Sequence, residues 1–234
     1  MEQDNVETIK YKQYTINIAQ DESPASPDEW QDDIAFLVGY HSDFTVEKDY
    51  IIKKEEAQAI ITQDYDDFDD GNGDFKHRCK MIEKNYHIFG LEAYIHSGVM
   101  LSIAHEGNFP DRNWDVSQLG LVLVSKENTK TRLKAKKLAE NLIDIWNMYL
   151  SGNVYGYFTE ESGDSCWGYY GQEGIKTAIQ EAKDNIDDDI KTQPKRIVKD
   201  NYTDITLGEL LSNKDNIIKR NAISILKQLQ RNTV

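Results

Sequence analysis

The chain has 234 residues, of which 39% are hydrophobic and 29% charged, enough apolar material for a real core. Lys and Arg number 27 against 41 Asp and Glu, and the resulting net charge of −14 argues against non-specific binding to DNA or anionic membranes. No apolar run reaches the ~18–20 residues of a transmembrane helix, and the N-terminus lacks the apolar region of a signal peptide. Two cysteines cannot form a disulfide framework in a chain of this length. We therefore expect a soluble, cytoplasmic protein.

The charge is unevenly distributed along the chain. Residues 1–75 contain 20 acids and 5 bases, and residues 138–190 contain 11 acids and 2 bases. The intervening residues 76–137 and the final residues 191–234 each have a net charge of +5. Acidic surfaces of this kind either keep a protein soluble and monomeric or bind a basic partner.

In the first third of the chain, alternating apolar and polar residues predict a half-buried strand over 7–19. Two prolines and six acids predict a loop over 20–33. The short apolar run 34–40 fits a buried strand or a short helix. Helical periodicity follows over 54–64, and the Asp-rich segment 64–76 reads as a solvated loop.

Strands are predicted in the middle of the chain over 86–104 and 119–124, joined by a turn-rich connection. The clearest helix spans 128–150, where apolar residues recur at intervals of three and four. Trp146 lies on this apolar stripe and is expected to pack against a sheet. We expect the other tryptophans in the core as well, with an aromatic ligand slot as the alternative.

Towards the C-terminus, the aromatic segments 153–159 and 165–171 predict a hairpin. A helix is predicted over 174–190, and Pro194 is expected to begin a linker. Two amphipathic segments within 203–231 then predict a helical hairpin.

Strands that arrive in consecutive runs, without strict alternation with helices, favour an α+β fold. We expect a mixed or antiparallel sheet packed on a long helix, with a C-terminal helical hairpin. The predicted domains are an α+β core over 1–190, which includes the acidic N-terminal part, and a linker with the hairpin over 191–234.

The histidines and the Asp-rich segment give no metal signature. None of the five histidines forms an HxxxH or HExxH pair. An EF-hand loop beginning at Asp70 fails because Phe75 occupies the position that requires glycine. No P-loop and no GxGxxG is present, so we predict neither a metal nor a cofactor.

One cluster could be drawn as a hydrolase triad. His96 falls at the end of one predicted strand, and Asp115 and Ser117 fall beside the next. Histidine, carboxylate and hydroxyl are the groups of nucleophilic acyl transfer, although no GxSxG elbow accompanies them. Hydrogen bonds that hold a hairpin together are the alternative explanation.

Three segments resemble a family of uncharacterised proteins carried by bacteriophages, plasmids and integrative elements. They are Ile95–Gly98, Trp114–Gly120 and Ser165–Gly171. The resemblance spans about residues 28–171. The sequence departs from the family pattern at two places: it has Ile95 where the family usually has Asp, and Val116–Ser117 where the family usually has Ser-Gly. It implies an accessory protein of a mobile element that acts in the host cell, and it implies no particular activity.

Together these observations lead to the hypothesis of an inhibitor that binds a host defence nuclease, as anti-CRISPR and antirestriction proteins do. Such nucleases have basic grooves that neutralise DNA phosphates, and an acidic face that mimics DNA could occupy one without itself binding nucleic acid. The expected contacts are Asp64, Asp66, Asp67, Asp69, Asp70 and Asp74. The alternatives are a hydrolase that uses His96, Asp115 and Ser117, and a protein that binds a small nucleotide signal in an aromatic pocket. The residues expected in that pocket are Trp114, Gln118 and Trp167.

Overall fold

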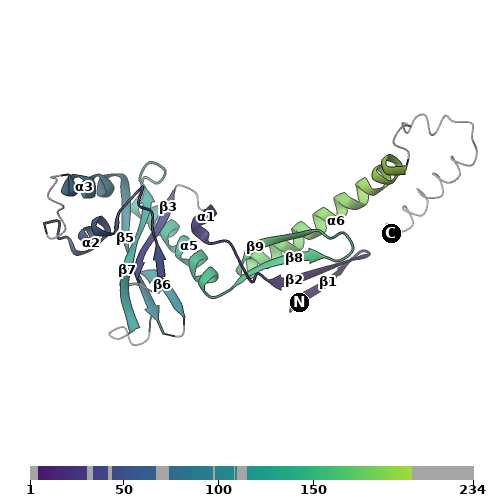
Figure 1. The fold of residues 1–234 in the computed structure, drawn as a ribbon, viewed down its shortest axis with the longest axis horizontal. Helices are drawn as coiled ribbons and strands as arrows, with labels where there is room; N and C mark the ends of the chain where they lie inside the picture. The colour runs from purple at the N-terminus through teal and green to yellow at the C-terminus, as the bar shows by residue number, and fades with distance from the viewer. Residues whose placement is uncertain are drawn as a thin grey trace, which may run out of the picture. The chain divides into compact units, whose positions relative to one another are not determined.

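The computed structural model describes residues 5–30, 34–41, 44–66, 74–96, 98–107, 109 and 115–201. The chain forms two compact units (Figure 1). Met1–Asp21 and Val154–Val234 make up the first, called here the outer unit, and Glu22–Asn153 make up the second, called here the inserted unit. Within the described residues, no helix combines the length and the apolar character needed to cross a membrane.

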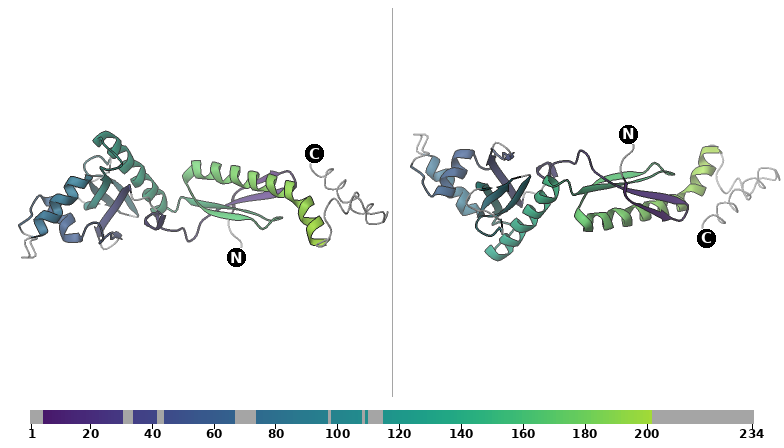
Figure 2. Two further views of the ribbon diagram at one scale, coloured as in Figure 1. Left: turned by 90° about the horizontal axis from the view of Figure 1, so that it is seen from above. Right: turned by 90° about the horizontal axis from the view of Figure 1, so that it is seen from below.

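The inserted unit is built on a five-stranded antiparallel sheet in the order β4-β3-β7-β5-β6. Its strands are β3 (Ala35–His41), β4 (Phe44–Val46), β5 (Tyr86–Ile95), β6 (Val99–Ile103) and β7 (Val116–Ser125). Its helices are α1 (Pro27–Trp30), α2 (Lys54–Thr62), α3 (Phe75–Asn85) and α5 (Arg132–Leu150). Helices α2 and α3 cover one face of the sheet and α5 covers the other (Figures 1 and 2).

The central strand β7 explains why both faces need a cover. Consecutive strand residues point to opposite faces, so Leu121 and Leu123 pack with α2 and α3, whereas Val122 and Val124 pack with α5. A strand buried on both sides reads as a continuous apolar run. Glycine is required at position 120 of this strand, because a Cβ there would lie 2.0 Å from the carbonyl oxygen of Val38 on the neighbouring strand.

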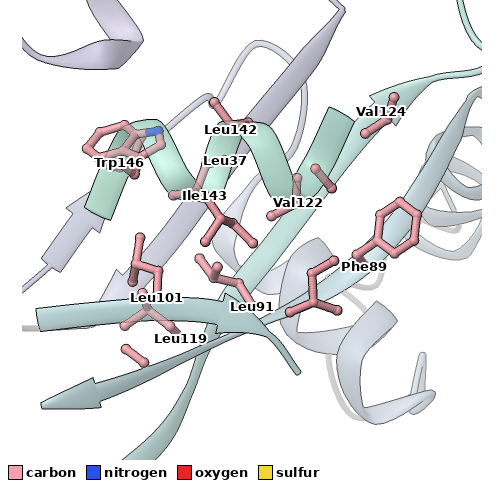
Figure 3. Close-up of a cluster of buried hydrophobic side chains, with 14 of the residues drawn as sticks. Leu37, Phe89, Leu91, Leu101, Leu119, Val122, Val124, Leu142, Ile143 and Trp146 are labelled. Carbon is pink, nitrogen blue, oxygen red and sulfur yellow. The ribbon is translucent and has the colours of Figure 1, made fainter. Parts of the chain in front are cut away.

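Helix α5 begins at a Thr131 cap, whose side-chain oxygen accepts a hydrogen bond from the Lys134 amide. Its apolar stripe then meets the sheet, and Figure 3 shows Leu142, Ile143 and Trp146 packed against the leucines of the strands. Trp146 is only 2% exposed, which confirms the prediction that it packs against the sheet.

The outer unit is a four-stranded antiparallel sheet covered by one long helix. Its elements are β1 (Asn5–Tyr11), β2 (Tyr14–Gln20), β8 (Val154–Thr159), β9 (Ser165–Tyr170) and α6 (Gly171–Asn201), with sheet order β1-β2-β8-β9. Ile16, Ile18 and Tyr157 form a core with Ala178 and Ala182 of α6. Strands β2 and β8 are neighbours although 132 residues separate Asp21 from Val154 in the chain, and the Asp21 amide donates to the Val154 carbonyl at 2.8 Å.

The α+β class and the antiparallel pairing are confirmed, but several details of the sequence prediction are wrong. The strands form two sheets rather than one. The expected strand 7–19 is a hairpin, which turns at Lys12 with a left-handed φ of 54°. Helix α3 was not predicted, because its polar sequence has few apolar positions. Trp30 and Trp167 are 47% and 37% exposed, so they do not belong to the core.

The predicted boundary at 190/191 falls inside α6, which continues through Pro194 to Asn201. A proline removes one helical hydrogen bond, but the surrounding Lys, Gln and Arg residues favour a helix. The predicted helical hairpin over 203–231 and Trp114 lie outside the described residues.

Candidate functional site

Acidic side chains are exposed where α2 ends and α3 begins. Asp64, Asp66 and Asp74 are all exposed, and the Asp66 carboxylate lies 3.6 Å from the Lys76 ammonium. Both members of that pair are more than half exposed, so the pair contributes little to stability. Asp74 occupies the N-cap position of α3, but its side chain accepts no capping hydrogen bond.

Tyr65 fixes the orientation of this segment. Its hydroxyl donates to the Glu83 carboxylate on α3 at 2.6 Å, and burial together with this bond raises the pKa of Tyr65 to about 12. Tyr65 is half-buried while both of its neighbours are exposed. Anchoring of the tyrosine therefore leaves the flanking Asp64 and Asp66 carboxylates in solvent.

A second acidic group surrounds the N-terminal end of α2. Glu47, Asp49 and Glu55 are exposed. They lie close enough to Tyr40 to add to the effect of its burial, which raises the pKa of that phenol to about 12. The Tyr40 hydroxyl donates to the Ile52 carbonyl at 3.2 Å. This hydrogen bond holds the Tyr40 side chain at the start of α2, next to these acids.

Acidic groups thus bracket α2 at both ends, and together they are called here the α2 acidic surface. It consists of Glu47, Asp49, Glu55, Asp64, Asp66 and Asp74. Three of these residues were predicted from sequence as partner contacts. The other predicted contacts, Asp67, Asp69 and Asp70, lie outside the described residues. Glu47, Asp49 and Glu55 were missed because lysines at 48, 53 and 54 lower the local charge in the sequence.

The structure brings His96 and Asp115 together at the ends of β5 and β7. The His96 Nδ1 atom lies 3.8 Å from an Asp115 carboxylate oxygen, and the His96 side chain is 69% exposed. This distance is longer than a hydrogen bond. The His96 ring also lies against Tyr94, which stacks on Phe109 at 5.7 Å. The carboxylate lies beside the imidazole but does not accept the hydrogen bond by which the acid of a triad orients its histidine.

Ser117 is not joined to this pair by any interaction in the described part of the chain. It lies on β7 opposite Ala93 of β5, and Ala93 belongs to the core under α5. Tyr94, the ring that contacts His96, is the next residue along β5 and so points to the other face. The described geometry therefore holds a His–Asp pair without a hydroxyl nucleophile beside it.

Gln118 lies near a buried carboxylate that the sequence reasoning missed. Glu92 is only 4% exposed, pairs with Gln118 across the strands, and accepts a hydrogen bond from the His105 amide at 2.9 Å. Burial of a carboxylate is costly unless it is hydrogen-bonded, and this bond ties the turn after β6 to the sheet. The signal in the sequence is a single acid inside the otherwise apolar strand 88–95.

Trp167, the other pocket candidate, belongs to the outer unit. Its ring lies on Gly156 of the adjacent strand so closely that a Cβ at residue 156 would be 2.1 Å from a ring carbon. Gly168, with φ of 89°, forms the bulge that separates Trp167 from Tyr169. Trp167 is therefore a half-exposed aromatic surface on the sheet.

The cysteines and the acids offer no further chemistry that the described residues support. Burial raises the pKa of the Cys79 thiol to about 11, which keeps it protonated at neutral pH. Among the described residues, no three His, Cys, Asp or Glu side chains are grouped to hold a metal ion. Comparisons with protein-family models, with curated proteins and with solved structures found no match.

Proposed function

We propose that the protein is an accessory protein of a phage or mobile element that inhibits a host defence nuclease by occupying its DNA-binding groove. The observation that carries this proposal is the exposure of the carboxylates that bracket α2. The net charge of −14 and the resemblance to mobile-element proteins support it. The inhibitor acts by binding and not by catalysis.

Electrostatics gives the proposal its physical basis. A groove that binds DNA carries Lys and Arg side chains positioned for phosphates, and an array of exposed carboxylates satisfies the same cations. Opposite charges steer the two proteins together and raise the association rate, while like charge repels DNA from the complex. The anchoring of Tyr65 to Glu83 reduces the entropy that the acidic segment loses on binding.

Capture from a lysate of the natural host tests the proposal. The immobilised protein should retain a nucleic-acid enzyme that salt elutes and that duplex DNA competes away. Its nuclease activity should fall in proportion to added protein until one inhibitor is bound per groove. Retention that duplex DNA does not affect would contradict the proposal.

A hydrolase is the second candidate, and the His96–Asp115 pair is the observation that favours it. If the protein is an enzyme, inhibition should be substoichiometric and should increase with time. His96→Ala should then abolish inhibition while leaving binding intact. The groove-binding proposal predicts that His96→Ala inhibits as well as the original protein, because His96 lies outside the α2 acidic surface.

A further inference from the structure

Basic side chains gather at the start of α5, although the protein as a whole is acidic. Positions 126–137 hold six bases and one acid, Glu127. Lys136 forms ion pairs with Glu106 at 2.8 Å and with Glu140 at 3.7 Å. In the part of the chain that the structure describes, the other five bases form no ion pair. These five are called here the α5 basic surface, and they are Lys126, Lys130, Arg132, Lys134 and Lys137.

Two of these cations are held in place without being neutralised. The Lys126 ammonium donates to the Glu83 carbonyl at 2.6 Å, and the Arg132 guanidinium donates to the Ile88 carbonyl at 3.2 Å. The guanidinium carbon also lies 4.6 Å from the centroid of the Phe89 ring. A main-chain carbonyl orients a cation but carries no net charge, so both side chains keep a full positive charge for a ligand.

The three lysines border a groove whose lining contains no acid. It has a volume of about 410 Å³, and its other lining residues are Leu138 and the uncharged Asn128, Thr129, Thr131 and Asn141. Glu127, the one acid of the segment, is exposed but does not belong to the lining. Lys, Asn and Thr are residue types that bind the phosphate oxygens of a nucleic-acid backbone. The lining therefore favours a ligand with phosphate groups.

Lys126 and Arg132 also line a second cavity, which has a volume of about 400 Å³ and is bordered by α2, β5 and β7. This volume lies within the ~300–1,000 Å³ of small-molecule sites. Gln118 belongs to the lining, and its side chain forms no hydrogen bond with the described residues. The walls are largely apolar, with Ile60, Ile61, Ile88 and Leu121. A flat, uncharged ring with hydrogen-bonding groups, such as a nucleobase, fits this combination.

The other ionisable groups of this cavity are already hydrogen-bonded within the protein. The Glu83 carboxylate accepts a hydrogen bond from the Tyr65 hydroxyl at 2.6 Å, and His87 Nε2 donates to the Thr129 carbonyl at 3.0 Å. The lysine and the arginine bring two permanent positive charges to the lining against this one carboxylate. An anionic group is therefore favoured beside the two cations.

We propose that the α5 basic surface binds a short single strand of nucleic acid, whose phosphates lie along the lysines while one base enters the cavity. Only a single strand leaves its bases free to enter such a cavity, because those of a duplex are stacked and paired. An acidic protein segment would satisfy the lysines but would leave the apolar cavity and Gln118 without a partner. The net charge of −14 repels the rest of a long strand, so a short strand fits best. This binding needs no nuclease and does not rest on the proposed function.

Competition for a labelled oligonucleotide tests the proposal on the full chain. The probe is a fluorescein-labelled oligothymidylate of eight nucleotides, and fluorescence anisotropy measures its binding. Three to five phosphate contacts predict that log affinity falls against log salt with a slope of about −2 to −3.5. An abasic strand of the same length, a hairpin duplex and octaglutamate should each compete at least about tenfold more weakly than unlabelled oligothymidylate. Absence of binding at low salt, or equal competition by any of the three, would overturn the proposal.

Charge-matched variants locate the site. Lys134→Gln with Lys137→Gln should weaken binding of the probe at least about tenfold and make the salt slope shallower by about 1.4. Lys176→Gln with Lys191→Gln removes the same charge from α6, where these side chains are 70% and 72% exposed, and should leave binding unchanged. Gln118→Ala should reduce the preference for oligothymidylate over the abasic strand without changing the slope. Equal effects of the two lysine pairs would overturn the proposed surface, and an unchanged preference in Gln118→Ala would overturn the entry of a base into the cavity.

Discussion

Trp146 offers a direct test of the packing between α5 and the five-stranded sheet. Its side chain is 2% exposed and meets the Phe44 and Tyr149 rings edge to face, at 5.4 Å and 5.8 Å. Removal of a large buried aromatic costs about 3–5 kcal/mol, so Trp146→Ala should destabilise the inserted unit by that amount. For a unit of about 130 residues, about 3–5 °C is lost per kcal/mol, and the melting temperature should fall by about 10–25 °C.

The indole nitrogen sharpens this test. Trp146 Nε1 is buried and has no hydrogen-bond partner among the described residues. A buried donor without a partner costs about 1–3 kcal/mol, and Trp146→Phe removes that cost, which offsets part of the free energy lost with the smaller ring. We expect Trp146→Phe to cost less than half as much as Trp146→Ala. Differential scanning calorimetry measures both, and the reasoning is refuted if the two variants are equally unstable or if Trp146→Ala melts like the original protein.

Three further predictions follow from other parts of the structure. Iodoacetamide at pH 8 should label the half-buried Cys166 in the native protein but label Cys79 only after unfolding, because Cys79 is buried and its pKa is raised to about 11. Mass spectrometry measures the labelling, and labelled Cys79 in the native protein would contradict this prediction. Replacement of residues 22–153 by Asn-Gly should leave an outer unit that folds by itself, because Asp21 and Val154 are already hydrogen-bonded neighbours that a two-residue turn can join. Circular dichroism should show cooperative unfolding of this shortened chain, and a chain without secondary structure would show that the outer unit does not fold independently. The Thr15 amide is the main cause of the lowered pKa of Glu161, so this carboxylate stabilises the outer unit above its ordinary pKa and loses that effect as pH falls through the lowered value. The difference in melting temperature between the original protein and Glu161→Gln should therefore be present at pH 6 and shrink as the pH falls below the ordinary value of 4.5. A constant difference would show that the charge is not responsible.

Much of the secondary structure could be predicted because it depends on local patterns. The apolar stripe of α5 and the apolar run of β7 each have the periodicity of their element. The turn at Lys12 could not be predicted, because a left-handed lysine between two strands has no glycine or asparagine to mark it. The two-unit organisation could not be predicted from the sequence for a different reason. It depends on the pairing of β2 with β8, which lie on either side of a complete unit in the chain, and local sequence patterns do not indicate contacts between such distant segments.

The candidate site was predicted in part. Charge counting indicated Asp64, Asp66 and Asp74, and all three are exposed; their role as partner contacts stays a prediction. His96 lies near Asp115 because the strand ends that carry them lie side by side, which the spacing in the sequence does not show by itself. Ser117 was included because sequence spacing does not show which face of a strand a residue occupies until the register is known.

The dependence of association on salt tests the central claim most directly. Its variant is Asp64→Asn with Asp66→Asn and Asp74→Asn, which removes three exposed charges at nearly constant side-chain size. Its control changes Asp184 and Asp188 to Asn, two exposed acids on α6 that belong to the outer unit and not to the α2 acidic surface. With the partner captured from the host, the association rate of the original protein should fall steeply as salt rises, because charges are screened within about 8–10 Å. The triple variant should associate more slowly at low salt with a shallower dependence, and the control should behave like the original protein. A rate that is independent of salt and equal for all three proteins would contradict the account.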